Sequence, residues 1–229
     1  MNDPAEKELT RKALIRTLGF VAFLALVIIV PAGPSYWQGW LYWIVFSLCC
    51  VILTLYFLRH DPALIERRMH AGARAEKEKS QQVIQAFLSV IMILLFVLPG
   101  IDHRFGWSHE PAVVAVAADV VVVLGFAIIF VTFKANSYAA AIIDVAPGQR
   151  VVSTGLYAVV RHPMYLGAVL LFLATPFGLG SVWSVIFAII ASGGIVWRLV
   201  EEERYLSQHL PGYNAYRRMT RHRLVPFIW

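Results

Sequence analysis

Hydrophobic residues in this chain are grouped into long runs that contain few charged positions. Four of the runs lie near Ala13–Val30, Trp37–Leu58, Val83–Pro99 and Ala112–Phe133. A helix needs roughly 20 apolar residues to cross the hydrocarbon core of a bilayer, which is about 30 Å thick. Each run therefore predicts a membrane-spanning helix.

A fifth apolar region, Met164–Trp197, is interrupted by the segment TPFGLGS at residues 175–181. Proline removes a backbone hydrogen-bond donor and glycine loosens the chain, so this segment predicts a tight turn between two helices. We expect the first arm of this helical hairpin to be short and to end before Pro176. The pattern predicts an all-α, polytopic membrane protein with five or six transmembrane helices.

Composition supports this class, because 59% of the 229 residues are hydrophobic and only 15% are charged. A soluble globular domain has about 45–50% apolar and about 25% charged residues. We expect residues 1–133 to form a transmembrane scaffold of about four helices. Residues 134–229 are predicted to form one catalytic unit, made of a polar connector, the hairpin and a polar carboxy-terminal segment.

The formal net charge of +6 would by itself suit a nucleic-acid-binding protein, but the distribution of basic residues indicates otherwise. Of the 20 lysines and arginines, only Arg104 falls in a loop that would face the far side of the membrane. This positive-inside bias predicts a protein of the cytoplasmic membrane with both termini in the cytoplasm, which six spans fit best. The lipid bilayer is the expected partner, and no nucleic acid is needed.

Asp119 is an acidic residue inside the fourth predicted span. A carboxylate is costly in a membrane, so its position makes it a candidate for function. It is far in sequence from the other polar residues, and we expect it to pack against a hydroxyl group of another helix.

The first of two polar clusters lies where the hairpin begins, in the run GLYAVVRHPMYLG at residues 155–167. Its polar members are Tyr157, Arg161, His162 and Tyr165. Pro163 suits the first turn of a helix, where its missing N–H costs nothing. Such a helix start also has free backbone N–H groups, which favour an anion such as a carboxylate.

The second cluster lies in WRLVEEERYL at residues 197–206, where the returning helix ends. Arg198 and Glu202 are four residues apart and therefore share one helix face. The spacing alone favours a self-satisfied pair, with Glu201 and Glu203 solvated. In a hairpin, however, the end of the second arm returns beside the start of the first, which brings this pair towards the first cluster.

Familiar soluble-enzyme motifs are missing. The chain has no GxGxxG after a strand, no Walker lysine, no HExxH, no GxSxG and no metal-like spacing of cysteine and histidine, so we expect no metal. The run GLYAVVRHPMYLG, followed by EEERYL, PGY and RHRLVPFIW, instead resembles the isoprenylcysteine carboxyl methyltransferase family, which is grouped with the phospholipid methyltransferases. The resemblance covers roughly residues 134–229, and RHPMY followed by RLVEEE is its most specific part.

Members of that family are integral membrane enzymes that use S-adenosylmethionine, so the resemblance implies this cofactor and a lipophilic or prenylated acceptor. The residues that match cofactor-contacting positions are Gln149, Arg150, Val151, Val152, Tyr157, His162, Tyr165 and Glu202. Arg198 matches an arginine on the substrate side, and Arg198 and Glu202 are the candidate catalytic residues. Gln149 stands where some relatives have histidine, a change that a backbone contact would tolerate.

The identity of the acceptor stays open between oxygen, nitrogen and sulfur nucleophiles. A carboxylate is already ionised at neutral pH and needs no general base, and Arg198 would orient it through a bidentate pair. An amine acceptor would first have to lose a proton, which gives His162 or a glutamate a larger role. A carboxylate of an isoprenoid or prenylcysteine-like molecule is the acceptor that the family resemblance favours.

Two other classes of protein fit the same polar clusters. An NADPH-dependent reductase of sterol-like or isoprenoid double bonds would be expected to carry more basic residues for the extra phosphate, which the acidic triplet fits poorly. A membrane assembly protein would use the clusters only to anchor helices. Replacing His162 or Arg198 by alanine would then alter stability without altering affinity for any cofactor.

Overall fold

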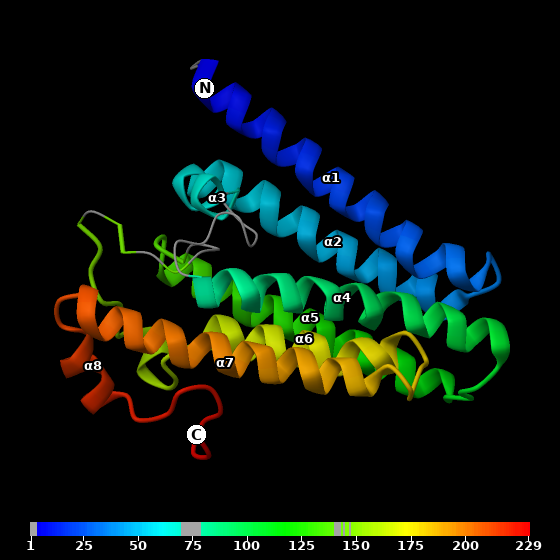
Figure 1. Cartoon of the computed structure of the whole chain (residues 1–229). Helices are drawn as coiled ribbons and strands as arrows, with labels where there is room; N and C mark the ends of the chain where they lie inside the picture. Colours follow the sequence, from blue (N-terminus) through cyan, green and yellow to red (C-terminus); the bar gives the residue numbers. More distant parts are fainter. Residues whose placement is uncertain (1–3, 70–78, 140–142, 144, 147) are drawn as a thin grey trace.

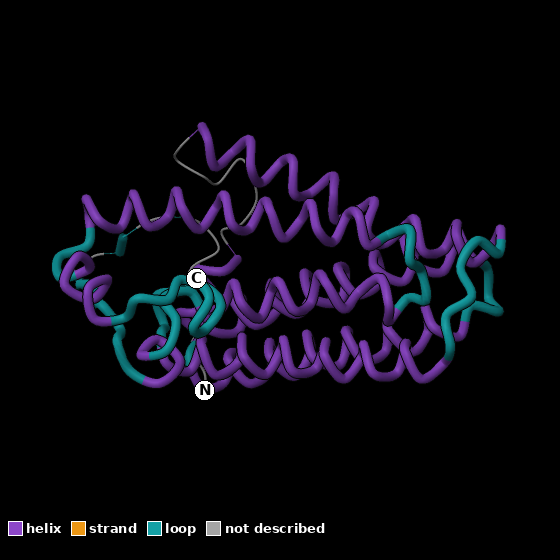
Figure 2. The backbone as a smooth tube through the Cα atoms, turned by 90° about the horizontal axis from the view of Figure 1, so that it is seen from below, coloured by secondary structure: helices purple, strands orange, loops and turns teal. Residues whose placement is uncertain are grey.

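The computed structural model describes residues 4–69, 79–139, 143, 145–146 and 148–229. These residues form helices and connecting loops, and none of them is in a β-strand. The long helices lie side by side in an elongated bundle, and both termini lie towards the same end of it (Figure 1). The loops gather at the two ends of the bundle (Figure 2).

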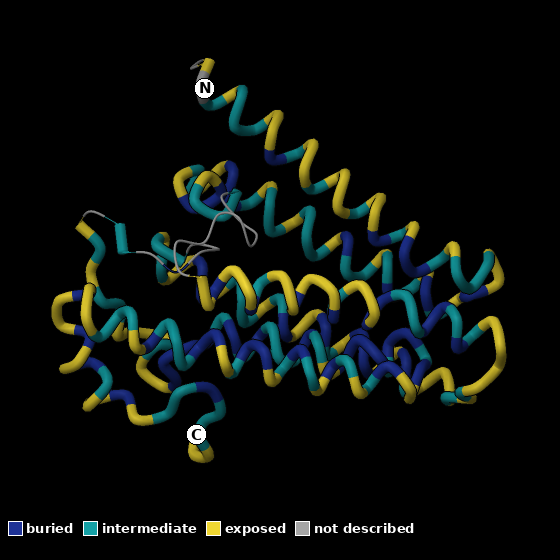
Figure 3. The backbone as a smooth tube through the Cα atoms, viewed as in Figure 1, coloured by how far each residue is buried: buried dark blue, intermediate teal, exposed yellow. Residues whose placement is uncertain are grey.

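The helices follow one another as α1 (Pro4–Ala32), α2 (Trp37–His60), α3 (Pro62–Met69), α4 (Lys79–Phe105), α5 (Ala112–Ala135), the short 3₁₀ helix η2 (Gly155–Ala158), α6 (Pro163–Gly178), α7 (Val185–His209) and α8 (Tyr213–Met219). By length and composition, four of them (α1, α2, α4 and α5) can cross a membrane. The four spans predicted from the apolar runs are therefore confirmed. Exposed positions are frequent along these helices (yellow in Figure 3), and many of them carry large apolar side chains, such as Leu18, Ile52 and Val113.

The hairpin is formed by α6 and α7, and its first arm is short, as predicted. With 16 residues, α6 is about 24 Å long, which is less than the thickness of a hydrocarbon core. The expectation that α6 ends before Pro176 is wrong, because the helix continues through Pro176 to Gly178. Because only two residues of α6 follow Pro176, the proline disturbs no more than the last turn of the helix. The turn begins where the N–H groups of Leu179 and Ser181 bond to the carbonyls of Thr175 and Pro176.

The core of the bundle has two main clusters of buried side chains. One joins α1, α2, α4, α5 and α6 around residues such as Ile28, Tyr42 and Val122. The other joins α4, α6 and α7 around Ile84 and Leu199. The second cluster also includes residues near the carboxy terminus, so it fixes the end of the hairpin at which α6 begins and α7 ends.

Asp119 is a buried residue of α5. It lies close to Tyr42 of α2 and Gly178 of α6. Neither oxygen of its carboxyl group has a hydrogen-bond partner in the described part of the chain. The expected hydroxyl partner is therefore absent from the described residues. The nearby hydroxyl of Tyr42 is engaged by Thr175 instead, at an O–O distance of 2.7 Å.

Candidate active site

A pocket lies at the end of the bundle where α6 begins and α7 ends. Its wall is formed by the connector that follows α5, by η2, by the first turn of α6, by the last turns of α7 and by α8. The sequence-predicted site residues all line it: Gln149, Arg150, Val151, Val152, Tyr157, His162, Tyr165, Arg198 and Glu202. The fold thus brings together residues that are separated by up to about 50 positions, while their individual roles remain predictions.

The start of α6 presents an imidazole and a phenol to the pocket. Pro163 occupies the first turn, as predicted, and His162 precedes it with φ of −126°. Proline disfavours a helical conformation in the residue before it, so His162 lies outside the helix. Its ring stacks on the ring of Tyr165, with centroids 5.6 Å apart and planes inclined by 17°. Both side chains are almost completely buried.

Tyr165 links the two polar residues of α7. Its hydroxyl donates to Glu202 Oε2 and accepts a hydrogen bond from Arg198 Nε at 3.2 Å. Because Arg198 and Glu202 are one turn apart on α7, the Tyr165 hydroxyl sits between a cation and an anion. The predicted approach of the two clusters is therefore observed, and Tyr165 is the residue that joins them.

Arg198 has a further partner that the sequence did not indicate. Its Nη1 donates to Oε1 of Gln81 at 3.1 Å, and Gln81 lies in the first turn of α4 with 2% of its surface exposed. The amide of Gln81 therefore orients the guanidinium group. A glutamine at the start of an apolar run gives no signal of this role, because only the packing of α4 against α7 brings it near Arg198.

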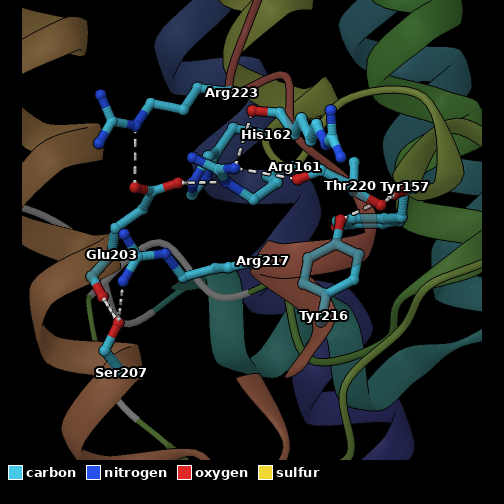
Figure 4. A network of polar contacts seen from close by, with 10 residues as sticks. Tyr157, Arg161, His162, Glu203, Ser207, Tyr216, Arg217, Thr220 and Arg223 are labelled. Carbon is cyan, nitrogen blue, oxygen red and sulfur yellow. Dashed lines mark hydrogen bonds and ion pairs between the residues drawn. The ribbon is translucent and has the colours of Figure 1, made fainter. Parts of the chain in front are cut away.

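Glu203 lies at the centre of a buried ionic network (Figure 4). Its Oε1 accepts from Arg161 Nε at 2.6 Å and lies 3.3 Å from His162 Nε2, while its Oε2 accepts from Arg223 Nε at 3.0 Å. The expectation that Glu203 is solvated is therefore wrong, since it is 4% exposed. Burial raises the pKa of Glu203, but the hydrogen bonds from His162 and Arg161 outweigh burial and hold this pKa at about 2.

The carboxy-terminal segment fixes this network from the other side. The N–H groups of Arg161 and His162 donate to the carbonyls of His222 and Arg223, at 2.9 and 3.0 Å. The Arg161 guanidinium also donates to the carbonyl of Thr220 at 2.9 Å. Residues 220–223 thus hold the chain that enters α6, and they determine where His162 faces the pocket.

Two further tyrosines of the pocket wall, Tyr157 and Tyr213, differ in the hydrogen bonding of their hydroxyl groups. Tyr157 accepts a hydrogen bond from Asn136 Nδ2 at 3.0 Å. Burial raises the pKa of Tyr157 to about 12; Asn136 opposes this shift and Glu202 adds to it. The phenol therefore keeps its proton at neutral pH and can donate it. The hydroxyl of Tyr213 is buried and has no hydrogen-bond partner in the described part of the chain.

An apolar cavity adjoins the polar pocket. It has a volume of about 600 Å³ and is lined mainly by aliphatic and aromatic side chains of α1, α2, α4, α5, α6 and α7. Met164, Tyr165 and Arg198 belong to the walls of both spaces. Arg68 of α3 also lines the apolar cavity, and this second arginine was not singled out from the sequence.

Residues 113–211 match the family model described as phospholipid methyltransferase. This segment is therefore similar to the phospholipid methyltransferases. A comparison with curated proteins finds no match to the chain. The family supports a membrane methyltransferase, which agrees with the apolar helices and with the family that the sequence resembles.

The matched segment includes nearly all of α5, the connector, α6 and the whole of α7. It therefore contains Arg198, Glu202 and Glu203. Arg68 and Gln81 precede it and residues 220–223 follow it, yet the fold brings these residues to the same end of the bundle. Within the described ranges, no group of three histidine, cysteine, aspartate or glutamate residues is arranged to hold a metal ion.

Proposed function

We propose that this protein is an S-adenosylmethionine-dependent methyltransferase that methylates the carboxylate of an isoprenoid or prenylcysteine-like lipid at the cytoplasmic face of the cell membrane. One observation carries the proposal. A polar pocket and an apolar cavity share a wall made of Met164, Tyr165 and Arg198. A polar cofactor and a lipid acceptor can therefore reach the same few atoms from opposite sides.

The lining of the polar pocket fits S-adenosylmethionine. Glu202 can accept hydrogen bonds from hydroxyl or amino groups, while the Tyr157 hydroxyl can donate one. The buried hydroxyl of Tyr213, which has no partner among the described residues, is a further donor or acceptor for a polar ligand. The aromatic faces of Tyr157 and Tyr165 favour a cation. When bound, S-adenosylmethionine supplies a methyl group activated by a sulfonium.

Gln149 has a structural role that fits its position in the connector. Its Oε1 accepts from the N–H of Ala146 at 3.0 Å, and its own N–H donates to the carbonyl of Ala146 at 3.0 Å. Its side chain therefore closes a turn instead of extending freely into the pocket. This agrees with the proposal that residues 149–152 line the cofactor largely through their backbone.

Arg198 is the residue that we propose orients the acceptor carboxylate. Its guanidinium is held by Tyr165 and Gln81, so its direction is set before any ligand arrives. Glu202 is held by Tyr165 on the cofactor side. The apolar cavity excludes water from the acceptor, which strengthens electrostatic interactions and removes the hydration shell of the carboxylate. Positioning and exclusion of water are the main contributions expected of this site.

A phospholipid amine is the second candidate acceptor, and the description of the matched family favours it. An amine must be deprotonated before it can accept a methyl group. Among the described residues, His162 is the one imidazole in the pocket wall, and it contacts the Glu203 carboxylate. Because the Nε2 atom of this ring faces Glu203 Oε1 at 3.3 Å, it is already engaged and is poorly placed to take a proton from an amine. We therefore favour the carboxylate.

The test is transfer of a tritiated methyl group from S-adenosylmethionine by purified protein, with farnesoic acid or phosphatidylethanolamine as acceptor. A methyl ester releases the label as methanol in alkali, whereas a methylated amine does not. We expect alkali-labile label on the acid, with kcat/KM reduced by about 10- to 100-fold in Arg198→Ala, since a charged hydrogen bond is lost. Glu201→Gln, a change beside the exposed Arg204, is the control. Alkali-stable label on the amine alone would contradict the proposal.

A further inference from the structure

Arg68 lies at the edge of the apolar cavity, although it belongs to the short helix α3. Its Nη1 donates to the carbonyl of Ala139 at 3.1 Å and lies 3.6 Å from the sulfur of Met164. Its guanidinium carbon is 4.4 Å above the ring of Phe133. No carboxylate among the described residues forms an ion pair with it. A half-buried guanidinium thus faces an apolar space, and the groups that contact it among the described residues are neutral.

A second cation lines the same cavity, since Arg198 is also part of its wall. Burial lowers the pKa of Arg68 to about 10; Tyr165 opposes this shift and repulsion from Arg198 adds to it. Two guanidinium groups in one apolar cavity repel each other, and an anion between them would relieve that repulsion. The charge of this region is therefore complementary to an acidic group.

The cavity has one polar end and one apolar end. Arg68, Gln85 and Arg198 come from the end of the bundle where α4 begins and α7 ends, whereas Phe46 and Phe96 lie further along α2 and α4. Along α4, Gln85 and Phe96 are separated by roughly 16 Å at 1.5 Å per residue. The volume of about 600 Å³ is in the range typical of small-molecule sites. This shape suits an extended amphiphile with a single acidic head.

The polar end is covered by α3 and by the start of the connector. Arg67 donates to the carbonyl of Ser137, and Arg68 to that of Ala139, so α3 is fastened over residues 137–139. A free acid needs a place only for its head group beside Arg68, whereas a polypeptide would also have to pass α3 and residues 137–139. The chemistry of the cavity therefore favours a free lipid acid over the carboxy terminus of a protein.

We propose that Arg68 binds the carboxylate of a free isoprenoid acid together with Arg198, while the hydrocarbon chain of the acid occupies the apolar cavity. This proposal rests on the proposed function and adds the residue that selects an acidic head. Arg68 acts on acceptor binding and not on the cofactor. Its loss is therefore expected to raise KM for the acid and to leave kcat nearly unchanged.

The test measures binding of tritiated farnesoic acid and of farnesol to purified protein at one fixed concentration of neutral detergent. We expect wild type to prefer the acid by about tenfold or more, as a charged hydrogen bond implies. Arg68→Gln should abolish this preference, and Arg68→Lys should keep part of it. Arg67→Gln is the matched control, because it also loosens α3 from the connector but lies outside the cavity lining.

Retention of the acid preference in Arg68→Gln would overturn the proposal. An equal loss in Arg67→Gln would also overturn it, because both arginines would then act by holding residues 137–139. Tighter binding of a prenylated peptide than of the free acid would overturn the choice of ligand. Binding of S-adenosylhomocysteine is measured on every variant: its absence from wild type would count against the proposed function, whereas the preference for the acid tests Arg68 alone.

Discussion

The three consecutive glutamates of α7 have three different environments, because successive residues of an α-helix are turned by about 100°. Glu201 pairs with Arg204 at the surface, with an N–O distance of 2.8 Å. Glu202 lines the pocket and accepts a hydrogen bond from Tyr165. Glu203 is buried against Arg161 and its neighbours. One acidic triplet thus supplies a surface pair, a pocket residue and a structural anchor.

Replacing Glu203 by glutamine is predicted to destabilise the protein strongly. The change leaves Arg161 buried without its carboxylate, and breaking a buried ion pair from one side costs about 3–5 kcal/mol. Thermal unfolding in detergent, followed by circular dichroism, should show a clearly lower midpoint. Glu201→Gln should change the free energy of unfolding by about 1 kcal/mol or less, because an exposed pair contributes little. Equal midpoints for the two variants would contradict the role assigned to Glu203.

The same carboxylate predicts a dependence of stability on pH. The pKa of Glu203 is lowered in the folded protein from 4.5 to about 2, so its contribution to stability is complete above pH 4.5. That contribution is lost as pH falls from 4.5 towards 2. The difference in unfolding midpoint between wild type and Glu203→Gln should therefore shrink over this interval. A difference that stays constant down to the lowest pH would show that the carboxylate is not ionised in the folded protein.

At the scale of elements, α5 and α6 are in contact through their backbones. A Cβ atom on Gly167 would lie 2.7 Å from the carbonyl oxygen of Gly125, and a Cβ on Gly125 would lie 2.9 Å from that of Gly167. Glycines allow this close approach, which is a common way of packing helices in membranes. Because α6 begins with His162 and Pro163, the glycine contact also sets the position of the pocket.

Gly167→Ala is predicted to destabilise the protein by about 1–3 kcal/mol, since the added carbon requires the two helices to separate. It should also weaken binding of S-adenosylhomocysteine by moving the start of α6. Gly193→Ala on α7 is the matched control, because a Cβ there meets nothing within 4 Å. The control should be neutral or slightly stabilising. Unchanged unfolding and ligand binding in Gly167→Ala would contradict the glycine contact.

The sequence predicts most of the helices, because the length of an apolar run and the position of a proline act directly on the local backbone. The four spans and the placement of Pro163 at the start of α6 follow from such signals. The end of α6 does not, because a proline in the last turn can be accommodated when the turn supplies other hydrogen bonds. Pro176 is that case. The burial of Glu203 depends on Arg223, which is 20 residues away and reaches it only in the folded chain.

At the scale of the whole molecule, the site draws on both halves of the chain. The polar pocket comes from residues after α5, as the motifs predicted. The amino-terminal helices contribute Gln81, which orients Arg198, and Arg68, which lines the apolar cavity. No local pattern marks these two residues, because each lies in a segment that is ordinary for a membrane protein. Their roles follow only from the way α3 and α4 pack beside the hairpin.

We propose that the polar pocket holds an adenosyl cofactor beside a lipid cavity. Calorimetric titration of S-adenosylhomocysteine into purified protein tests it most directly, with NADPH titrated separately. We expect saturable binding of S-adenosylhomocysteine and no binding of NADPH. Folded Glu202→Gln and Tyr165→Phe variants should bind about tenfold more weakly, because each loses a hydrogen bond in the pocket wall. Binding of NADPH in its place, or of neither ligand to folded wild type, would contradict the account.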